Sequence, residues 1–122
     1  MQQIQKEIKS YLEERGWLDD NVSGYAKSIA IEAAELLEHF QWNNPTRQEA
    51  KNDPEKLEKI RKEIADVVIY SIDLAVQLDI DVESAVRAKL DHNRKKYPVD
   101  LVKGKSHMVK KIQEEWRKKG IN

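Results

Sequence analysis

Two pairs of acidic residues stand at a spacing that brings carboxylates together on helices. Glu32 and Glu35 are three residues apart, and Glu63 and Asp66 repeat that spacing further along the chain. Residues i and i+3 of a helix lie on one face. On a wheel of about 100° per residue, Glu32 falls among apolar residues and Glu35 lies about 60° away, at their edge. Burying several carboxylates together is unfavourable unless a positive charge joins them.

Four converging carboxylates have a hard divalent cation as their natural partner. Oxygen ligands favour Mg²⁺, Mn²⁺ or Ca²⁺ over zinc, and Mg²⁺ keeps positions open for water and substrate phosphates. The opposing interpretation is that these acids are solvated and pair with lysines. It suits Glu63, which has Lys59 and Lys62 nearby, better than Glu32, whose neighbours are apolar. Spacing alone leaves both interpretations open.

Other metal and phosphate chemistries lack their sequence motifs. None of the three histidines, His39, His92 and His107, lies three residues after a glutamate, as a di-iron bundle requires. There is no His-Glu-x-x-His zinc motif and no Walker-type glycine loop. Any bound phosphates would therefore be held by metal and side chains.

The acid pairs fall on two of five predicted helices, and no strand is expected. The apolar periodicity predicts helices over residues 3–15, 24–41, 54–78, 82–96 and 106–119, separated by polar connectors at 17–23 and 42–53. Asp53 as N-cap and Pro54 begin the third helix, and Tyr97-Pro98 ends the fourth. The buried stripe predicted for the third helix consists of Leu57, Ile60, Ile64, Val67, Ser71, Leu74, Ala75 and Leu78.

Composition places the chain among small helical proteins. Its 122 residues suit one domain, and 36% charged residues with few Gly and Pro favour long helices. Equal numbers of basic and acidic residues argue against nucleic-acid binding. No cysteine, membrane-length apolar run or signal-peptide core is present, so a cytoplasmic protein that engages no membrane is expected. The segment from Lys103 to Lys119 is locally basic, and its stripe of Met108, Ile112 and Trp116 predicts packing or subunit contact.

Three segments form a series of motifs: residues 32–42 read E-x-x-E-L-x-E-x-F-Q-W, residues 63–70 read E-x-x-D-V-x-x-Y, and residues 89–98 read K-x-x-x-N-x-x-K-Y-P. In this order they resemble the motifs of the MazG-like and dCTP-pyrophosphatase group of all-α nucleoside triphosphate pyrophosphohydrolases. The agreement in order and spacing runs from about Ile29 to Gly104. The chain departs from the group just before the second helix, where Val22–Lys27 replaces the usual Pro-Lys-Asn.

The resemblance implies that a metal-activated water hydrolyses an NTP or dNTP between its α- and β-phosphates, releasing a monophosphate and pyrophosphate. The cation would be Mg²⁺, with Mn²⁺ as a possible substitute. For Glu38, Arg94, Lys96 and Tyr70, ordinary surface or core positions remain open alternatives. The implied roles are metal ligation by Glu32, Glu35, Glu63 and Asp66, catalysis by Glu35 and Glu38, phosphate contact by Lys89, Asn93, Arg94 and Lys96, and base contact by Trp42, Tyr70 and Trp17.

The resulting expectation is a four-helix-type bundle over residues 1–104 with a basic helical tail over 105–122. A long apolar third helix in so small a chain predicts a homodimer or homotetramer. The resemblance suggests removal of unwanted nucleotides, with a possible dCTP-type preference. Two alternatives stay open: a phosphoribosyl-nucleotide pyrophosphohydrolase of the same fold, and a non-enzymatic helical module whose basic tail binds an acidic partner.

Overall fold

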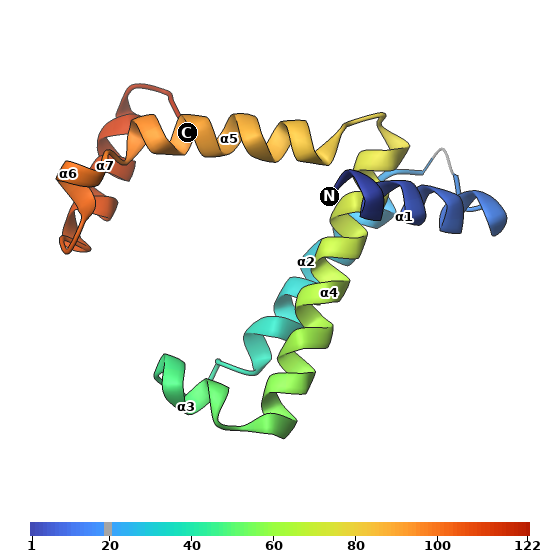
Figure 1. Ribbon diagram of the computed structural model, residues 1–122, viewed down its shortest axis with the longest axis horizontal. Coiled ribbons are helices and arrows are strands. Elements are labelled where there is room, and N and C mark those ends of the chain that lie inside the picture. Colours follow the sequence, from blue (N-terminus) through green and yellow to red (C-terminus); the bar gives the residue numbers. More distant parts are fainter. Residues whose placement is uncertain (19–20) are drawn as a thin grey trace. The chain divides into compact units, whose positions relative to one another are not determined.

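The computed structural model describes residues 1–18 and 21–122, which form helices and short connections (Figure 1). No strand occurs within these ranges, so the all-α prediction is confirmed. Asp19 and Asp20, in the predicted connector 17–23, lie outside the described residues. The helices are α1 (Gln2–Glu14), α2 (Ser23–Glu38), α3 (Arg47–Lys51), α4 (Pro54–Gln77), α5 (Val82–Lys96), α6 (Val99–Val102) and α7 (His107–Lys118). They divide into two compact units, residues 1–82 and 83–122.

The first unit is built on the pairing of α2 with α4, which run side by side (Figure 1). Helix α1 packs against α4, and the core of this contact is formed by Leu12, Ile72 and Val76. The side chain of Gln5 fastens α1 to the turn that follows α4. Its amide Nε2 donates to the carbonyl of Ile80 at 2.8 Å, and its Oε1 accepts from the N–H of Val82 at 2.9 Å.

Left-handed residues end both α1 and α4. Gly16 (φ 67°) follows α1, and the N–H of Trp17 then donates to the carbonyl of Leu12 at 2.9 Å. Asp79 (φ 55°) follows α4 in the same way, with the N–H of Ile80 donating to Ala75 at 2.8 Å. These bonds satisfy carbonyls that the helix ends would otherwise leave without partners. The turn at Gly16 fixes the direction in which the chain leaves α1, and hence the position of Trp17.

The predicted start of α4 is confirmed, whereas the connector before it was wrongly predicted as a loop. The Asp53 carboxylate accepts from the N–H of Lys56 at 3.1 Å, and Pro54 is the first helical residue. Within the connector, α3 forms because Thr46 and Glu49 make a reciprocal capping box. The residues from His39 to Gln41 were also wrongly assigned to the second helix, since α2 ends at Glu38.

The buried stripe predicted for α4 is only partly correct. Ile60 and Ala75 are buried, but Ile64, Ser71 and Leu78 are exposed. Ile72 is the most deeply buried residue of α4, and it packs with the buried Val76 against Leu12 of α1. The periodicity correctly indicated an amphipathic helix, but it did not indicate where α1 covers it.

The second unit joins α5 to the short α6 and the C-terminal α7. Ile112 of α7 is buried, and the ring of Trp116 meets His92 edge-on with 5.3 Å between centroids. The buried Lys96 places its Nζ 5.5 Å from the Tyr97 ring centroid and 5.6 Å from that of Trp116. The predicted C-terminal helix is confirmed. None of the helices within residues 1–18 and 21–122 has both the length and the apolar character needed to cross a membrane.

Candidate functional site

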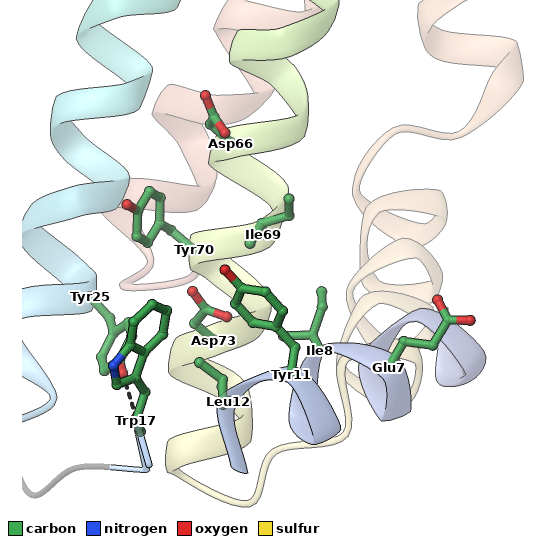
Figure 2. A pocket seen from close by; sticks show the side chains of 10 residues that line it. All are labelled: Glu7, Ile8, Tyr11, Leu12, Trp17, Tyr25, Asp66, Ile69, Tyr70 and Asp73. Carbon is green, nitrogen blue, oxygen red and sulfur yellow. Dashed lines mark hydrogen bonds between the residues drawn. The ribbon is translucent and has the colours of Figure 1, made fainter. Parts of the chain in front are cut away.

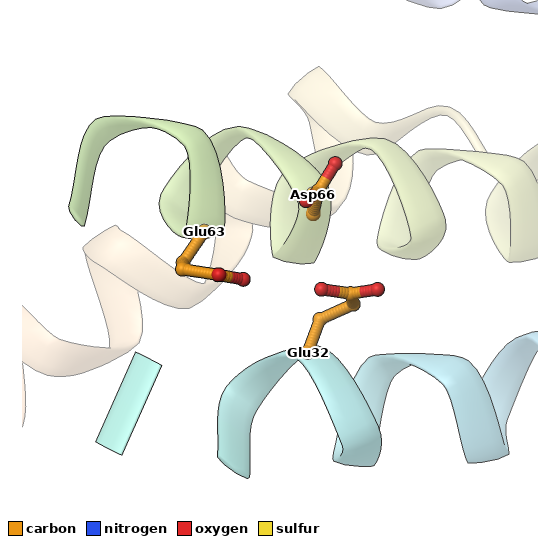
Figure 3. Close-up of side chains that lie close together, drawn as sticks. All are labelled: Glu32, Glu63 and Asp66. Atoms are coloured by element: carbon orange, nitrogen blue, oxygen red, sulfur yellow. The ribbon is translucent and has the colours of Figure 1, made fainter. Parts of the chain in front are cut away.

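Three carboxylates converge between α2 and α4 (Figure 3). Glu32 comes from α2, while Glu63 and Asp66 come from adjoining turns of α4. Each offers one oxygen, and these three oxygens lie within 4.8 Å of one another. All three side chains are half-buried. The pairing of two helices with i, i+3 acids therefore brings three of the four predicted metal ligands into one cluster.

The electrostatics of this cluster favour a bound cation. One oxygen of Glu32 and one of Glu63, both Oε2, are buried without a hydrogen-bond partner. The pKa of Glu32 is raised to about 7, first by burial, then by a side-chain hydrogen bond with Glu35, and then by the negative charges of Glu35, Asp66 and Glu63. Buried acceptors that meet only other acceptors need a positive charge or protons. The donor set, which consists of oxygens alone, fits a hard divalent cation.

Glu35 lies beside this cluster rather than within it. It is half-buried, one turn along α2 from Glu32. Its carboxylate accepts the hydrogen bond that a protonated Glu32 donates. The fourth predicted acid is thus placed next to the other three, and its hydrogen bond with Glu32 connects it to them.

A pocket of about 530 Å³ adjoins the acid cluster (Figure 2). Asp66 belongs to both, because it lines the pocket and contributes an oxygen to the cluster. The predicted base contacts Trp17 and Tyr70 both line this pocket. Beside them are two further tyrosines, Tyr11 and Tyr25, so that four of the ten lining residues are aromatic. A planar apolar ring could bind there while an anionic group reaches the cations expected at the acids.

Trp17 is held in the pocket wall by contacts from three helices. Its backbone carbonyl accepts from the Tyr25 hydroxyl at 2.8 Å and from Gln77 Nε2 at 2.9 Å. Its ring meets that of Tyr11 at 72°, with 5.9 Å between centroids. Together with the Gly16 turn, these contacts give the indole a defined position without enclosing it fully.

Glu38 and Trp42 lie elsewhere, near the other end of α2. They line a separate hollow of about 330 Å³ with His39, Asp53 and Lys56 among its other residues. Trp42 is 86% exposed. Within one chain, the structure therefore brings neither the predicted water-orienting acid nor the predicted base contact Trp42 into the acid cluster or the aromatic pocket.

The predicted phosphate contacts all lie on α5, in the second unit. Lys89 and Asn93 are one turn apart, and Lys89 Nζ donates to the backbone carbonyl of Asn122 at 3.4 Å. Arg94 pairs with Asp91, and Lys96 is buried against aromatic rings. Their role toward a triphosphate stays a prediction.

The pocket also contains Tyr11, Tyr25 and Asp73, which the sequence reasoning did not assign to a site. A signal for Asp73 was nevertheless present. It lies three residues after Tyr70 and seven after Asp66, so all three share one face of α4. Once Asp66 and Tyr70 were assigned to a site, the helical period pointed to Asp73 as well.

Comparison with known proteins assigns the family. Residues 27–116 match the MazG-like family, and this match extends past Gly104, where the resemblance noted in the sequence ends. The chain belongs to the MazG-like family. It is 36% identical over 78 residues to mouse dCTP pyrophosphatase 1 and 32% identical over 80 residues to the human protein. These stretches cover 63% and 65% of this chain but only 46% and 47% of those proteins, so the similarity spans about half their length.

A solved structure shares the fold. A pyrophosphatase from Archaeoglobus fulgidus superposes with a TM-score of 0.66 at 35% sequence identity. The match covers 79% of this chain and 90% of the archaeal chain. The helical architecture described above is thus that of a known pyrophosphatase.

Proposed function

We propose that this chain is a divalent-cation-dependent nucleoside triphosphate pyrophosphohydrolase, which converts an NTP or dNTP and water into the monophosphate and pyrophosphate. The observation that carries the proposal is the sharing of Asp66 between the acid cluster and the aromatic pocket. One end of such a site suits a cation with phosphates, and the other suits a base. Relatives named dCTP pyrophosphatase and pyrophosphatase support this assignment.

Mg²⁺ is the cation that we propose, held by Glu32, Glu63 and Asp66 with Glu35 beside them. The buried oxygens without partners on Glu32 and Glu63 support this set. When bound, the cation supplies charge that polarises phosphate oxygens, makes a water more acidic and stabilises leaving pyrophosphate. Mn²⁺, which accepts the same oxygen ligands, is the expected substitute.

The chain's own residues position the reactants. In the cation-free cluster, Glu35 accepts a hydrogen bond from protonated Glu32. We propose that Glu35 orients the attacking water once Glu32 is ionised and no longer donates to it. Trp17 and Tyr70 flank the base in the pocket. Glu38 and Trp42 keep their proposed catalytic and base-binding roles only if the assembled oligomer brings them to a site.

Lys89 and Asn93 remain the proposed triphosphate contacts, with Arg94 and Lys96 assisting. A lysine and an amide one turn apart on α5 can meet phosphate oxygens as charge and as hydrogen-bond donor. Lys89→Ala should raise KM for the nucleotide, whereas Lys59→Ala, which removes a lysine from an exposed ion pair on α4, should not. Equal effects of the two substitutions would contradict the assignment.

We also propose that the protein works as a homodimer or homotetramer. Helix α2 has no fully buried residue, and Ile31 and Leu37 on it are 58% and 61% exposed. Ile64 and Val68 on α4 are also exposed. Apolar side chains exposed along both helices need a cover, and we propose that a second copy of the chain supplies it. Light scattering at micromolar concentration should give a mass of at least twice 14.3 kDa, and a monomer would contradict this proposal.

Ion-exchange chromatography of reaction products tests the function. Each common and modified NTP and dNTP is incubated with the 122-residue chain in Mg²⁺ and, separately, in EDTA. The proposal predicts a monophosphate and pyrophosphate in Mg²⁺ and no products in EDTA, with deoxycytidine substrates favoured. Diphosphate and orthophosphate would contradict the site of cleavage. A role in clearing unwanted cytoplasmic nucleotides would follow from a preference for modified dNTPs.

A further inference from the structure

Asp73 is a buried acid among the residues that line the aromatic pocket. It is 5% exposed, and its Oδ1 is buried without a hydrogen-bond partner. Figure 2 shows its carboxyl group among the aromatic side chains that line the pocket. It belongs to neither the three-carboxylate cluster nor any described ion pair. A buried hydrogen-bond acceptor is therefore built into this pocket, in addition to the less buried carboxylates of Glu7 and Asp66.

Such a group is unfavourable in the empty pocket. A buried acceptor without a donor loses its hydration and gains nothing in return. Burial raises the pKa of Asp73 for the same reason. No Lys, Arg or His is among the described residues that line this pocket, so the missing partner is not a neighbouring cation. The simplest donor is a neutral N–H of a molecule that enters the pocket.

The position of Asp73 relative to the acid cluster fits a nucleotide. Asp66 and Asp73 are seven residues apart on α4, about two turns and roughly 10 Å along the helix axis. Phosphates held near Asp66 would leave the base at the Asp73 end, between Trp17 and Tyr70. The aromatic rings can stack on any base, so they do not discriminate between bases. A single buried hydrogen-bond acceptor can discriminate between bases, because it favours a base that places an N–H group opposite it.

We propose that Asp73 accepts a hydrogen bond from the exocyclic amino group of the base, and so selects cytosine over uracil and thymine. This inference rests on the proposed function and adds its specificity. Uracil and thymine carry a carbonyl oxygen where cytosine carries its amino group. Their oxygen would face the Asp73 oxygen, leaving two buried acceptors without a donor.

The test substitution is Asp73→Asn, which keeps the size of the side chain. The amide can turn either its oxygen or its NH₂ toward the base, so it accommodates both an amino group and a carbonyl. We expect wild-type protein to prefer dCTP to dUTP in kcat/KM. In Asp73→Asn that preference should fall by about ten- to a hundredfold, chiefly through better use of dUTP. Asp79→Asn, with the same charge change in the turn after α4, should keep the wild-type preference, because asparagine accepts the left-handed backbone there.

A binding measurement separates this inference from the proposed function. Thermal stabilisation by non-hydrolysable analogues of dCTP and dUTP is measured in Mg²⁺ for wild type and both variants. If wild type hydrolyses dNTPs but Asp73→Asn leaves the preference unchanged, Asp73 is only structural and the inference fails while the function stands. If wild type hydrolyses no nucleotide but prefers the dCTP analogue in binding, and Asp73→Asn removes that preference, the function fails while the inference stands. A wild-type preference for dUTP overturns the inference directly.

Discussion

Neutralising Glu63 should change stability in opposite directions with and without the cation. Glu63→Gln keeps the length of the side chain but removes one negative charge from the cluster. The Glu63 and Asp66 oxygens lie within 4.8 Å, and two unit charges at that distance repel by about 1 kcal/mol in water-like surroundings and about 3.5 kcal/mol at an effective dielectric of 20. Both side chains are half-buried, so the repulsion that the substitution removes should lie between these two values. The buried Oε2 of Glu63, which has no partner, adds to the strain that the substitution removes.

In EDTA, Glu63→Gln should therefore melt several degrees above wild type, at about 3–6 °C per kcal/mol for a chain of this size. In Mg²⁺ the order should reverse. Wild type gains about 2.7 kcal/mol when the cation is at a hundred times its Kd, whereas the variant has lost a ligand and gains little.

The assay is differential scanning calorimetry of both proteins in EDTA and across a Mg²⁺ titration. Glu58→Gln is the matched control, because it makes the same change on the same helix and breaks only the exposed 3.6 Å ion pair with Arg61. Such a pair is worth about 0–1 kcal/mol, so the control should follow wild type in both conditions. The reasoning is refuted if Glu63→Gln is less stable than wild type in EDTA, or if Mg²⁺ stabilises both equally.

Three further predictions concern the cation, the pocket wall and the core. Because the pKa of Glu32 is raised from 4.5 to about 7, the stability contributed by its protonated form is complete below about pH 4.5 and lost as pH rises through 7. Without the cation, the protein should therefore lose stability as the pH rises over that range, and Glu32→Gln should flatten this loss. The affinity for Mg²⁺ should increase over the same range, as calorimetric titrations at pH 6 and 8 would show. Gly16→Ala should lower the free energy of unfolding by about 1–2 kcal/mol in urea, because Gly16 has a φ of 67°. The same substitution should displace Trp17 and so raise the KM for the nucleotide in steady-state kinetics. Ile72→Ala, at a 1% exposed position, should cost about 2–5 kcal/mol in urea unfolding, whereas Ile31→Ala, on the exposed side of α2, should cost far less in dilute monomeric protein.

The acid cluster was predictable because it depends on two local patterns and one pairing. Acids at i and i+3 lie on one helix face whatever the surroundings, and Glu32 already stood among apolar residues. Only the pairing of α2 with α4 had to be assumed. Glu35 was harder to place, because its position at the edge of the face lets it lie beside the cluster as readily as within it.

The features that escaped prediction depend on contacts between distant segments. Ile64 and Leu78 have the period of buried residues but are exposed, since α1 covers a neighbouring strip of α4. Asp73 received no role from the sequence, because its surroundings depend on Trp17, which comes from a distant part of the chain to line the same pocket. In contrast, α3 could have been predicted, because the Thr46–Glu49 capping box is a local signal.

The most direct test of the central claim is a ³¹P NMR time course of dCTP hydrolysis in Mg²⁺. Wild type, Glu63→Gln and the control Glu58→Gln are compared at equal concentration, and each is repeated in EDTA. We predict that wild type and Glu58→Gln give dCMP and pyrophosphate at similar rates, that Glu63→Gln gives almost none, and that EDTA stops every reaction. Wild-type turnover by Glu63→Gln, turnover in EDTA, or release of dCDP and orthophosphate would contradict the account.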